Sequence, residues 1–384
     1  MKKISILLIV ILLVFLIIDI CSAEVGVSST EIVVGQSAAL GGPAQGLGKG
    51  MKAGMEAYFK YINSEGGVNG RRIRLISYDD GYEPDRCIEQ TRKLIEEGVF
   101  VLIGYVGTPT SNAAVPIAEK EHVPYIGPFT GAEFLRNPVK HYVMNIRGSY
   151  YNETEGLVKH LTEDLGIKKI ACFYQNDSYG QAGLAGVQRA LESRKMSLAG
   201  EGTYERNTLA VKGGLARIKA GSPEAVIMIG AYAPCAAFIK LAKQIGMAEV
   251  KFCNVSFVGS DNLKEALGEA GEGTIISQVV PFPWDMSIPV VEEYHRMIKK
   301  YSPQQKPGFV SLEGYMAAKF FVQAVEAAGR DLTREGLISA IENKGTFDLG
   351  GITLTFSYDD HQGMDKIHYT VIDKEDFKSV NSLR

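Results

Sequence analysis

Short apolar runs alternate with longer amphipathic stretches along most of this 384-residue chain, and this alternation restricts the fold more than any other feature. A short apolar run bounded by turn residues predicts a buried strand, and a longer amphipathic stretch predicts a helix. Strand, helix, strand in repeated order predicts parallel βαβ units. In the first half, the predicted strands are "EIVVG" (31–35), "RIRLISY" (72–78), "VFVLIG" (99–104) and "VPYIGP" (123–128), and the predicted helices cover 46–65, 84–98 and 110–121.

The same pattern restarts after about residue 147. Because the repeat is complete in each half, the sequence predicts an α/β fold with two doubly wound lobes. The predicted strands of the second half are "KKIACFY" (168–174), "SLAGEGTY" (197–204), "AVIMIGA" (225–231) and "VKFCNVSFVG" (250–259), and the predicted helices cover 179–193, 208–219 and 234–246.

The last quarter of the chain is less regular. It predicts helices near 287–301, 309–328 and 333–343, followed by strands in "GITLTFS" and "KIHYTVI". A chain that returns to helices after two complete α/β units is expected to add them to the first unit.

The amino terminus has the layout of a secretory signal peptide. Lys2 and Lys3 precede an apolar run that ends near "CSA", and the small residue Ala23 suits the position before a cleavage site. We therefore predict a signal peptide over residues 1–23. The alternative is a lipid anchor at Cys21, although the Asp and Ile of "IDIC" fit such a site poorly. The apolar run is shorter than the about 20 residues that a membrane span needs.

Charge and cysteine content exclude some partners. The net charge is only −3 and no basic cluster is present, which argues against a nucleic-acid partner. Four cysteines follow the predicted cleavage site, and export would permit disulfides between them. Because the segments around them are apolar or amphipathic, unpaired buried thiols are the favoured interpretation. These cysteines are Cys87, Cys172, Cys235 and Cys253.

Sequence signals for catalysis are missing. The chain has no HExxH, no GxSxG and no EF-hand loop, and its six histidines are scattered. The loop "GGPAQGLGKG" looks like a phosphate-binding loop, but Pro43 and Gly50 stand where a Walker motif needs Gly and Ser or Thr. The sequence therefore predicts a protein that is not an enzyme and needs neither a cofactor nor a metal.

One loop combines glycines and hydroxyls at the carboxyl end of a predicted strand. In "GYVGTPTSNA" (104–113), Gly107 and Thr108 precede a predicted helix, and Thr110 and Ser111 follow. Ligands of open α/β sheets bind at the carboxyl ends of the strands, and free N–H groups at a helix start favour an anion. These hydroxyls could bind a carboxylate, or one of them could simply cap the helix. Comparable strand ends hold Thr130, Tyr179 and Tyr232, and all four loops could face one cleft between the lobes.

The sequence resembles the type I solute-binding proteins of bacterial ABC importers, in the leucine/isoleucine/valine-binding branch. The resemblance covers nearly the whole chain after residue 23 and rests on several stretches. These are "IVVGQSAALGGPAQGLG", "NSEGGVNGRRIRLISYDD", "VLIGYVGTPTS", "VPYIGP", "NDSYGQAG" and "EGYMAAKFF". It implies two Rossmann-like lobes joined by three hinge crossings, a periplasmic monomer that closes around a small solute, and delivery of that solute to a membrane permease. The implied lobes are 24–146 plus 280–357 and 147–279 plus 358–384.

The resemblance also implies a set of ligand-binding residues. Thr108, with backbone N–H groups beside Gly107, matches the hydroxyl residue that binds an amino acid's carboxylate. Tyr179 and Tyr232 match two tyrosines of the second lobe. Leu47 falls near an aromatic residue at the cleft lip, and Phe309 falls near an apolar wall residue.

Two departures affect the expected ligand. Ser256 stands where amino-acid binders of this family have an acidic residue that pairs with the ligand's ammonium. Gly131 stands where the family is expected to have a hydroxyl residue. The nearby Phe129 adds bulk, and Thr130 could supply the missing hydroxyl by a small shift. A buried ammonium without a carboxylate partner is costly, so an α-amino group on the ligand is not assured.

Arg147 and Glu313 each leave two interpretations open. Arg147, near the first expected crossing, could meet a ligand carboxylate through two hydrogen bonds, or it could stabilise the hinge or lie at the surface. Glu313 could replace the missing acid or could belong to a helix start. The sequence thus predicts a periplasmic receptor for a small carboxylate-bearing solute of the branched-chain amino acid type. The alternatives are a sensor subunit with the same fold, or a binder of an aromatic or 2-oxo acid.

Overall fold

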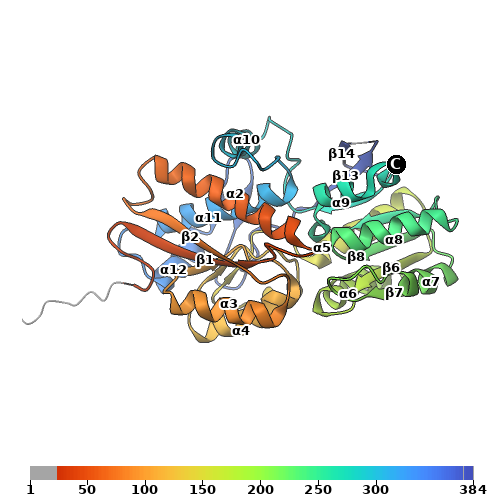
Figure 1. Ribbon diagram of the computed structural model, residues 1–384, viewed down its shortest axis with the longest axis horizontal. Helices are drawn as coiled ribbons and strands as arrows, with labels where there is room; N and C mark the ends of the chain where they lie inside the picture. Colours follow the sequence, from red (N-terminus) through yellow and green to blue (C-terminus); the bar gives the residue numbers. More distant parts are fainter. Residues whose placement is uncertain (1–23, 375, 384) are drawn as a thin grey trace, which may run out of the picture.

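The computed structural model describes residues 24–374 and 376–383 as two α/β lobes side by side along the long axis (Figure 1). The predicted signal peptide, residues 1–23, and the alternative anchor Cys21 lie outside the described residues. The predicted fold class, two doubly wound α/β lobes, is confirmed.

The first lobe is built on a five-stranded sheet in the order β2-β1-β3-β4-β5. All four strand pairs are parallel, so the carboxyl ends of the strands lie at one edge. The strands are β1 (Glu31–Ala38), β2 (Arg72–Asp79), β3 (Val101–Ile103), β4 (Tyr125–Ile126) and β5 (Val143–Met144). The helices and turns between them are α2 (Gln45–Ser64), α3 (Pro84–Glu96), α4 (Thr108–Lys120) and the 3-10 turn η1 (Glu133–Leu135).

Three helices from the last quarter of the chain also belong to this side of the molecule (Figure 1). Helix α11 packs so closely on α2 that a Cβ on Gly54 would lie 1.9 Å from the carbonyl oxygen of Ser311. Glycine is therefore needed where these two helices meet. The elements of this segment are α10 (Pro289–Tyr301), α11 (Phe309–Ala328), α12 (Arg334–Lys344), β11 (Thr346–Asp348) and β12 (Thr353–Thr355).

The second lobe is built on a seven-stranded sheet in the order β14-β13-β10-β9-β8-β6-β7. Its strands are parallel except β13 and β14, which pair in antiparallel fashion at one edge. The strands are β6 (Ile170–Gln175), β7 (Glu201–Tyr204), β8 (Ala225–Ile229), β9 (Lys251–Asn254), β10 (Ile275–Gln278), β13 (His368–Asp373) and β14 (Asp376–Val380). The helices are α5 (Tyr150–Lys159), α6 (Ser178–Glu192), α7 (Lys212–Ala220), α8 (Tyr232–Gln244) and α9 (Ser260–Leu267), with shorter turns η2 (His160–Asp164), η3 (Ser256–Val258) and η4 (Gly268–Gly271).

The chain passes between the lobes three times: from β5 to α5, from β10 to α10, and from β12 to β13. The first and third crossings lie side by side, because the N–H of Asn145 donates to the carbonyl of His361 and the N–H of Gly363 donates to the carbonyl of Asn145. Two of the three crossings are thereby tied together by backbone hydrogen bonds.

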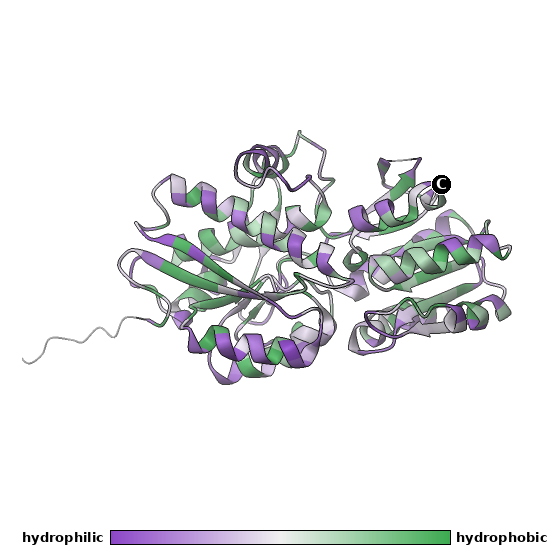
Figure 2. Ribbon diagram, viewed as in Figure 1, coloured by the Kyte–Doolittle hydropathy of each residue, from purple (hydrophilic) through white to green (hydrophobic). Residues whose placement is uncertain are grey.

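The strands and the inward faces of the helices form the core, while polar residues cover the outside (Figure 2). Every residue of β6 and β8 is buried, as expected for strands covered on both faces. The four described cysteines are buried and unpaired, which confirms the prediction of core thiols.

Some elements differ from the sequence prediction. The predicted strand over 250–259 ends at Asn254, where the chain turns into η3. Helix α5 was not predicted, because its buried face includes Glu153 and Thr154 and so breaks the apolar periodicity. Its start is fixed by a capping box between Ser149 and Asn152.

Candidate ligand-binding cleft

The first turn of α4 places its three hydroxyls in different roles. Thr110 Oγ1 donates to the carbonyl oxygens of Val106 (2.6 Å) and Gly107 (3.0 Å), and Ser111 Oγ accepts from Tyr125 (3.0 Å). Both therefore stabilise the loop and the first turn of the helix. Thr108, the first residue of α4, makes its hydrogen bonds elsewhere.

Thr108 belongs to a buried cluster of three hydroxyls. Its Oγ1 lies 2.6 Å from Thr130 Oγ1, and the hydroxyl of Tyr150 lies 3.4 Å from Thr108 and 3.3 Å from Thr130. Tyr150 begins α5 beyond the first crossing, so the cluster joins both sides of that crossing. Gly131 permits the approach, since a Cβ there would lie 2.7 Å from the Tyr150 ring. Tyr150 was not among the residues selected from the sequence, because no local pattern distinguishes it.

Arg147 lies in the first crossing and is fully buried. Its guanidinium carbon is 4.8 Å from the centre of the Phe129 ring, a cation–π contact. Nη2 donates to Ser256 Oγ and lies 3.6 Å from Glu153 Oε1, while Nη1 lies 3.4 Å from Glu313 Oε1. Arg147 is therefore not a surface residue, and it faces carboxylates from both lobes.

The two glutamates differ in their surroundings. Glu153 accepts from the Ser256 N–H (2.7 Å), Ser256 Oγ (3.0 Å) and Ser277 Oγ (2.6 Å). Burial raises the pKa of Glu153, and Arg147 and these hydrogen bonds oppose the rise. Burial raises the pKa of Glu313 to about 7, although Arg147 acts in the opposite direction. Burial alone would lower the pKa of Arg147, but Glu313 and Glu153 raise it.

Aromatic rings from both lobes meet beside this cluster. The Phe257 ring of η3 lies 5.3 Å from Phe129 and 5.9 Å from Tyr82, both on the first-lobe side. It also lies 4.5 Å from Tyr179 of α6, which in turn lies 5.5 Å from Tyr150. All five rings are buried. The sequence did not single out Phe257 or Tyr82, since buried aromatic residues are common in cores.

The lobes also contact each other at the rim. The Tyr232 hydroxyl accepts from the Gly46 N–H (3.3 Å), beside the buried Leu47. Arg206 binds Asp177 and, across the lobes, Glu83, each at 2.8 Å. The described conformation is therefore one in which the lobes are closed on each other.

Phe309 lies apart from the hydroxyl cluster. It begins α11, and its N–H donates to Asp261 (3.0 Å), a partly buried carboxyl whose pKa is raised by desolvation to about 6. Its ring joins Trp284 (5.6 Å) and Phe377 (5.2 Å) in an aromatic cluster near the second crossing. The structure thus gathers eight of the eleven residues selected from the sequence around the hydroxyl cluster and Arg147, and it places Tyr232 and Leu47 at the rim and Phe309 in this separate cluster.

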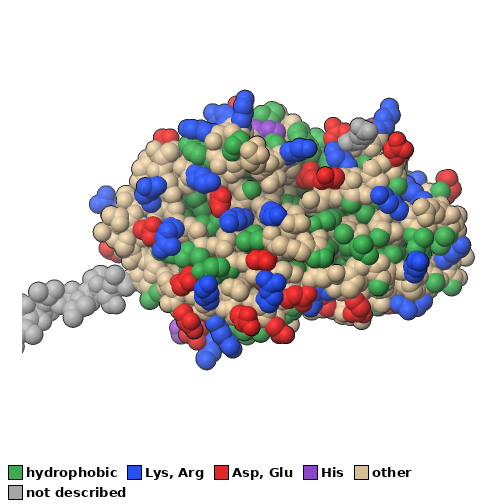
Figure 3. Space-filling model, in the orientation of Figure 1, with side chains coloured by type: hydrophobic (Ala, Val, Ile, Leu, Met, Phe, Trp, Pro, Cys, Tyr) green, Lys and Arg blue, Asp and Glu red, His purple; other side chains and the backbone are tan. Residues whose placement is uncertain are grey.

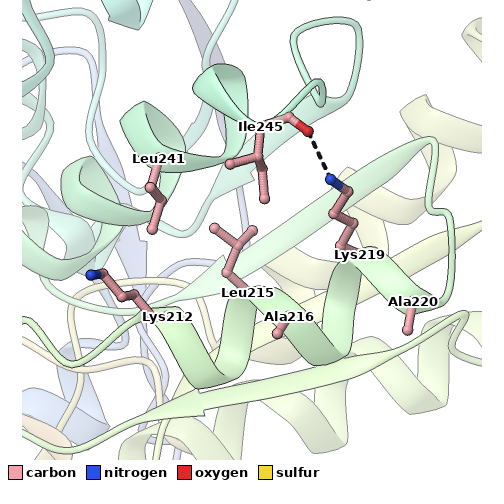
Figure 4. Close-up of a pocket in the computed structure, with 7 residues that line it drawn as sticks. All are labelled: Lys212, Leu215, Ala216, Lys219, Ala220, Leu241 and Ile245. Atoms are coloured by element: carbon pink, nitrogen blue, oxygen red, sulfur yellow. Dashed lines mark hydrogen bonds between the residues drawn. The ribbon is translucent and has the colours of Figure 1, made fainter.

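Other surface features lie away from the cleft. A groove of about 470 Å³ between α7 and α8 is lined by Leu215, Leu241 and Ile245, with Lys219 bonded to the Ile245 carbonyl (Figure 4). Acidic and basic side chains are interspersed on the face shown in Figure 3. Residues 24–374 and 376–383 include no helix long and apolar enough to cross a membrane. The same ranges hold no group of three or more His, Cys, Asp or Glu that could bind a metal ion.

Comparisons with known proteins agree with this architecture. The sequence model of a family described as "Periplasmic binding protein" matches residues 31–376. A crystal structure of a possible leucine/isoleucine/valine-binding protein from Rhodopirellula baltica SH 1 is 38% identical, covers 92% of this chain and 96% of its own, and superposes with a TM-score of 0.88. A substrate-binding periplasmic protein from Ralstonia solanacearum is 26% identical, with 91% and 100% coverage and a TM-score of 0.85.

Among curated proteins, the leucine-, isoleucine-, valine-, threonine- and alanine-binding protein of Pseudomonas aeruginosa is 23% identical over 80% of this chain and 81% of its own length. These matches define a periplasmic binding protein. The chain belongs to the leucine/isoleucine/valine-binding family of type I periplasmic binding proteins.

Proposed function

We propose that this protein is the substrate-binding component of an ABC importer and binds a small carboxylate-bearing solute between its lobes. The buried pair formed by Thr108 at the start of α4 and Thr130 after β4 carries this proposal. The hydroxyls and the positive end of the helix dipole suit a carboxylate, and Tyr150 adds a third hydroxyl from beyond the crossing. The branched-chain amino acids named for the relatives indicate a solute of similar size.

The proposed mode of action is closure of the lobes on the solute followed by delivery to a membrane permease. A ligand that contacts both lobes stabilises the closed state by its preferential affinity for that state. The proposed lobes are 24–146 plus 280–357 and 147–279 plus 358–384. The protein would act as a periplasmic monomer after cleavage behind Ala23.

The test is titration calorimetry of Thr108→Val, with Thr353→Val on the exposed strand β12 as the control. Loss of the Thr108 hydroxyl should weaken carboxylate binding about tenfold or more, because a hydrogen bond to a charged group contributes about 1.5–3 kcal/mol. The control should bind as the wild type does. Equal affinities for all three proteins would show that the solute binds elsewhere.

A further inference from the structure

The protein supplies fewer hydrogen-bond acceptors around Arg147 than the side chain of Arg147 has donors. A guanidinium carries N–H groups on Nε, Nη1 and Nη2. Nη2 donates to Ser256 Oγ, whereas Nε and Nη1 have no hydrogen-bond partner although the residue is fully buried. Buried donors of a permanent charge are rarely left unpaired, because their desolvation is costly.

The carboxylates beside Arg147 do not meet this demand. The oxygens of Glu153 already accept from Ser256 and Ser277. Glu313 Oε1 lies 3.4 Å from Nη1 without making a hydrogen bond and could satisfy at most part of that one nitrogen. Glu313 Oε1 is itself unpaired but can accept from only one of the two free guanidinium nitrogens, so at least one donor of Arg147 is left without an acceptor.

These donors lie where the lobes meet. The guanidinium is 4.8 Å from the Phe129 ring on the first-lobe side and bonds to Ser256 of the second lobe. Arg147 also lies close enough to Tyr150, whose hydroxyl belongs to the cluster proposed to hold the carboxylate, that its charge opposes the rise in the pKa of Tyr150 caused by burial. A second group on a small acid bound there would thus face a guanidinium.

We infer that the bound acid carries an oxygen acceptor beside its carboxylate, as a 2-oxo or 2-hydroxy acid does, and that Arg147 selects it over an α-amino acid. This inference rests on the proposed function, since it concerns the ligand of the same cleft. An oxygen would accept from the unpaired N–H groups of Arg147. An ammonium has only donors and so could not pair with these N–H groups.

The first experiment compares leucine with two acids of the same carbon skeleton, α-ketoisocaproate and α-hydroxyisocaproate. We expect calorimetry to show about tenfold or tighter binding of either oxygen-bearing acid relative to leucine, a difference of about 1.4 kcal/mol. If leucine binds as tightly or more tightly, the inference is overturned, while the proposed function stands.

Two variants show whether Arg147 is the selecting residue. Arg147→Lys keeps the positive charge between the glutamates but loses the planar donor array, so preference for the oxygen-bearing acids should fall about tenfold. An unchanged preference would refute the assignment. If this variant does not fold, Glu313→Gln supplies the test. It removes the carboxylate that lies 3.4 Å from Nη1 and leaves the guanidinium intact, so the preference for the oxygen-bearing acids should be at least as strong as in the wild type. A weaker preference would refute the assignment to Arg147. Loss of leucine binding alone in that variant would instead assign an ammonium to Glu313.

Mass spectrometry separates failure of this inference from failure of the proposed function. The protein purified without added ligand is unfolded, and the released small molecules are identified. A released acid with an oxygen and no amino group beside the carboxylate supports the inference, and an α-amino acid overturns it. If no acid is released and none of the three probes binds, the proposed function and the inference that rests on it both fail.

Discussion

The contact between Arg206 and Glu83 offers a direct test of lobe closure. Arg206 follows β7 in the second lobe, and Glu83 precedes α3 in the first. Their 2.8 Å contact crosses the rim of the cleft, and Asn207 adds a 2.7 Å hydrogen bond to the same carboxylate. Replacing Arg206 with Gln removes the charge while leaving Thr108 and Arg147 in place. The change should therefore affect closure rather than direct contacts with a ligand.

The expected size of the effect follows from exposure. The Arg206 and Glu83 side chains are 22% and 41% exposed, so solvent screens much of their attraction. A partly exposed, hydrogen-bonded ion pair contributes about 0.5–1 kcal/mol. If the contact exists only in the closed state, its loss lowers the closed fraction and weakens apparent ligand affinity by about two- to fivefold.

A matched control is available within the second lobe. Arg194 contacts Glu155 at 2.7 Å and is 19% exposed, but this pair does not cross the cleft. Calorimetric titration should show weaker binding for Arg206→Gln and wild-type binding for Arg194→Gln. Small-angle scattering of ligand-free protein should show a larger radius of gyration only for Arg206→Gln. Equal behaviour of the two variants would refute the role of this contact in closure.

Two further predictions concern the interior of the cleft. Phe257→Ala should allow bulkier acids to bind, because the Phe257 ring lies between rings of both lobes. In competition titrations, affinity for an aromatic acid should rise relative to affinity for α-ketoisocaproate. An unchanged order of affinities would exclude a role of Phe257 in selecting ligand size. Burial raises the pKa of Glu313 from 4.5 to about 7, so the native state binds more protons than the unfolded state between these values. Glu313 should therefore make the unfolding free energy fall by on the order of 2 kcal/mol as pH rises through that window. Urea denaturation of Glu313→Gln should show a pH dependence of the unfolding free energy that lacks this fall. An unaltered pH dependence would show that Glu313 titrates normally in the folded protein.

Much of the fold was predictable because each lobe repeats one local pattern. Fully buried strands such as β8 appear in the sequence as continuous apolar runs, and helices such as α3 appear as amphipathic stretches bounded by Pro84 and Gly98. The pattern failed at α5, where the buried side chains include Glu153 and Thr154. A carboxylate that is buried because distant segments supply its partners leaves no local signal in the sequence.

The same reason limits prediction of the cleft. Thr108 could be selected because a hydroxyl at a helix start after a parallel strand has a local meaning. Arg147 remained ambiguous, since its partners Ser256 and Glu313 are more than a hundred residues away along the chain. Phe257 was missed because only the packing of the two lobes distinguishes it from an ordinary core aromatic residue.

The position of Arg147 links recognition of the ligand to closure of the lobes. Its backbone belongs to the first crossing, while its side chain meets Ser256 and Glu153 of the second lobe and Glu313 on α11 of the first. Closure therefore removes water from a permanent charge, and the protein alone leaves two of its nitrogens unpaired. This desolvation opposes closure. A ligand whose acceptor pairs with those nitrogens should therefore favour the closed state more than a ligand of equal size that has no such acceptor. The side chain that discriminates between ligands would then also determine which of them closes the lobes.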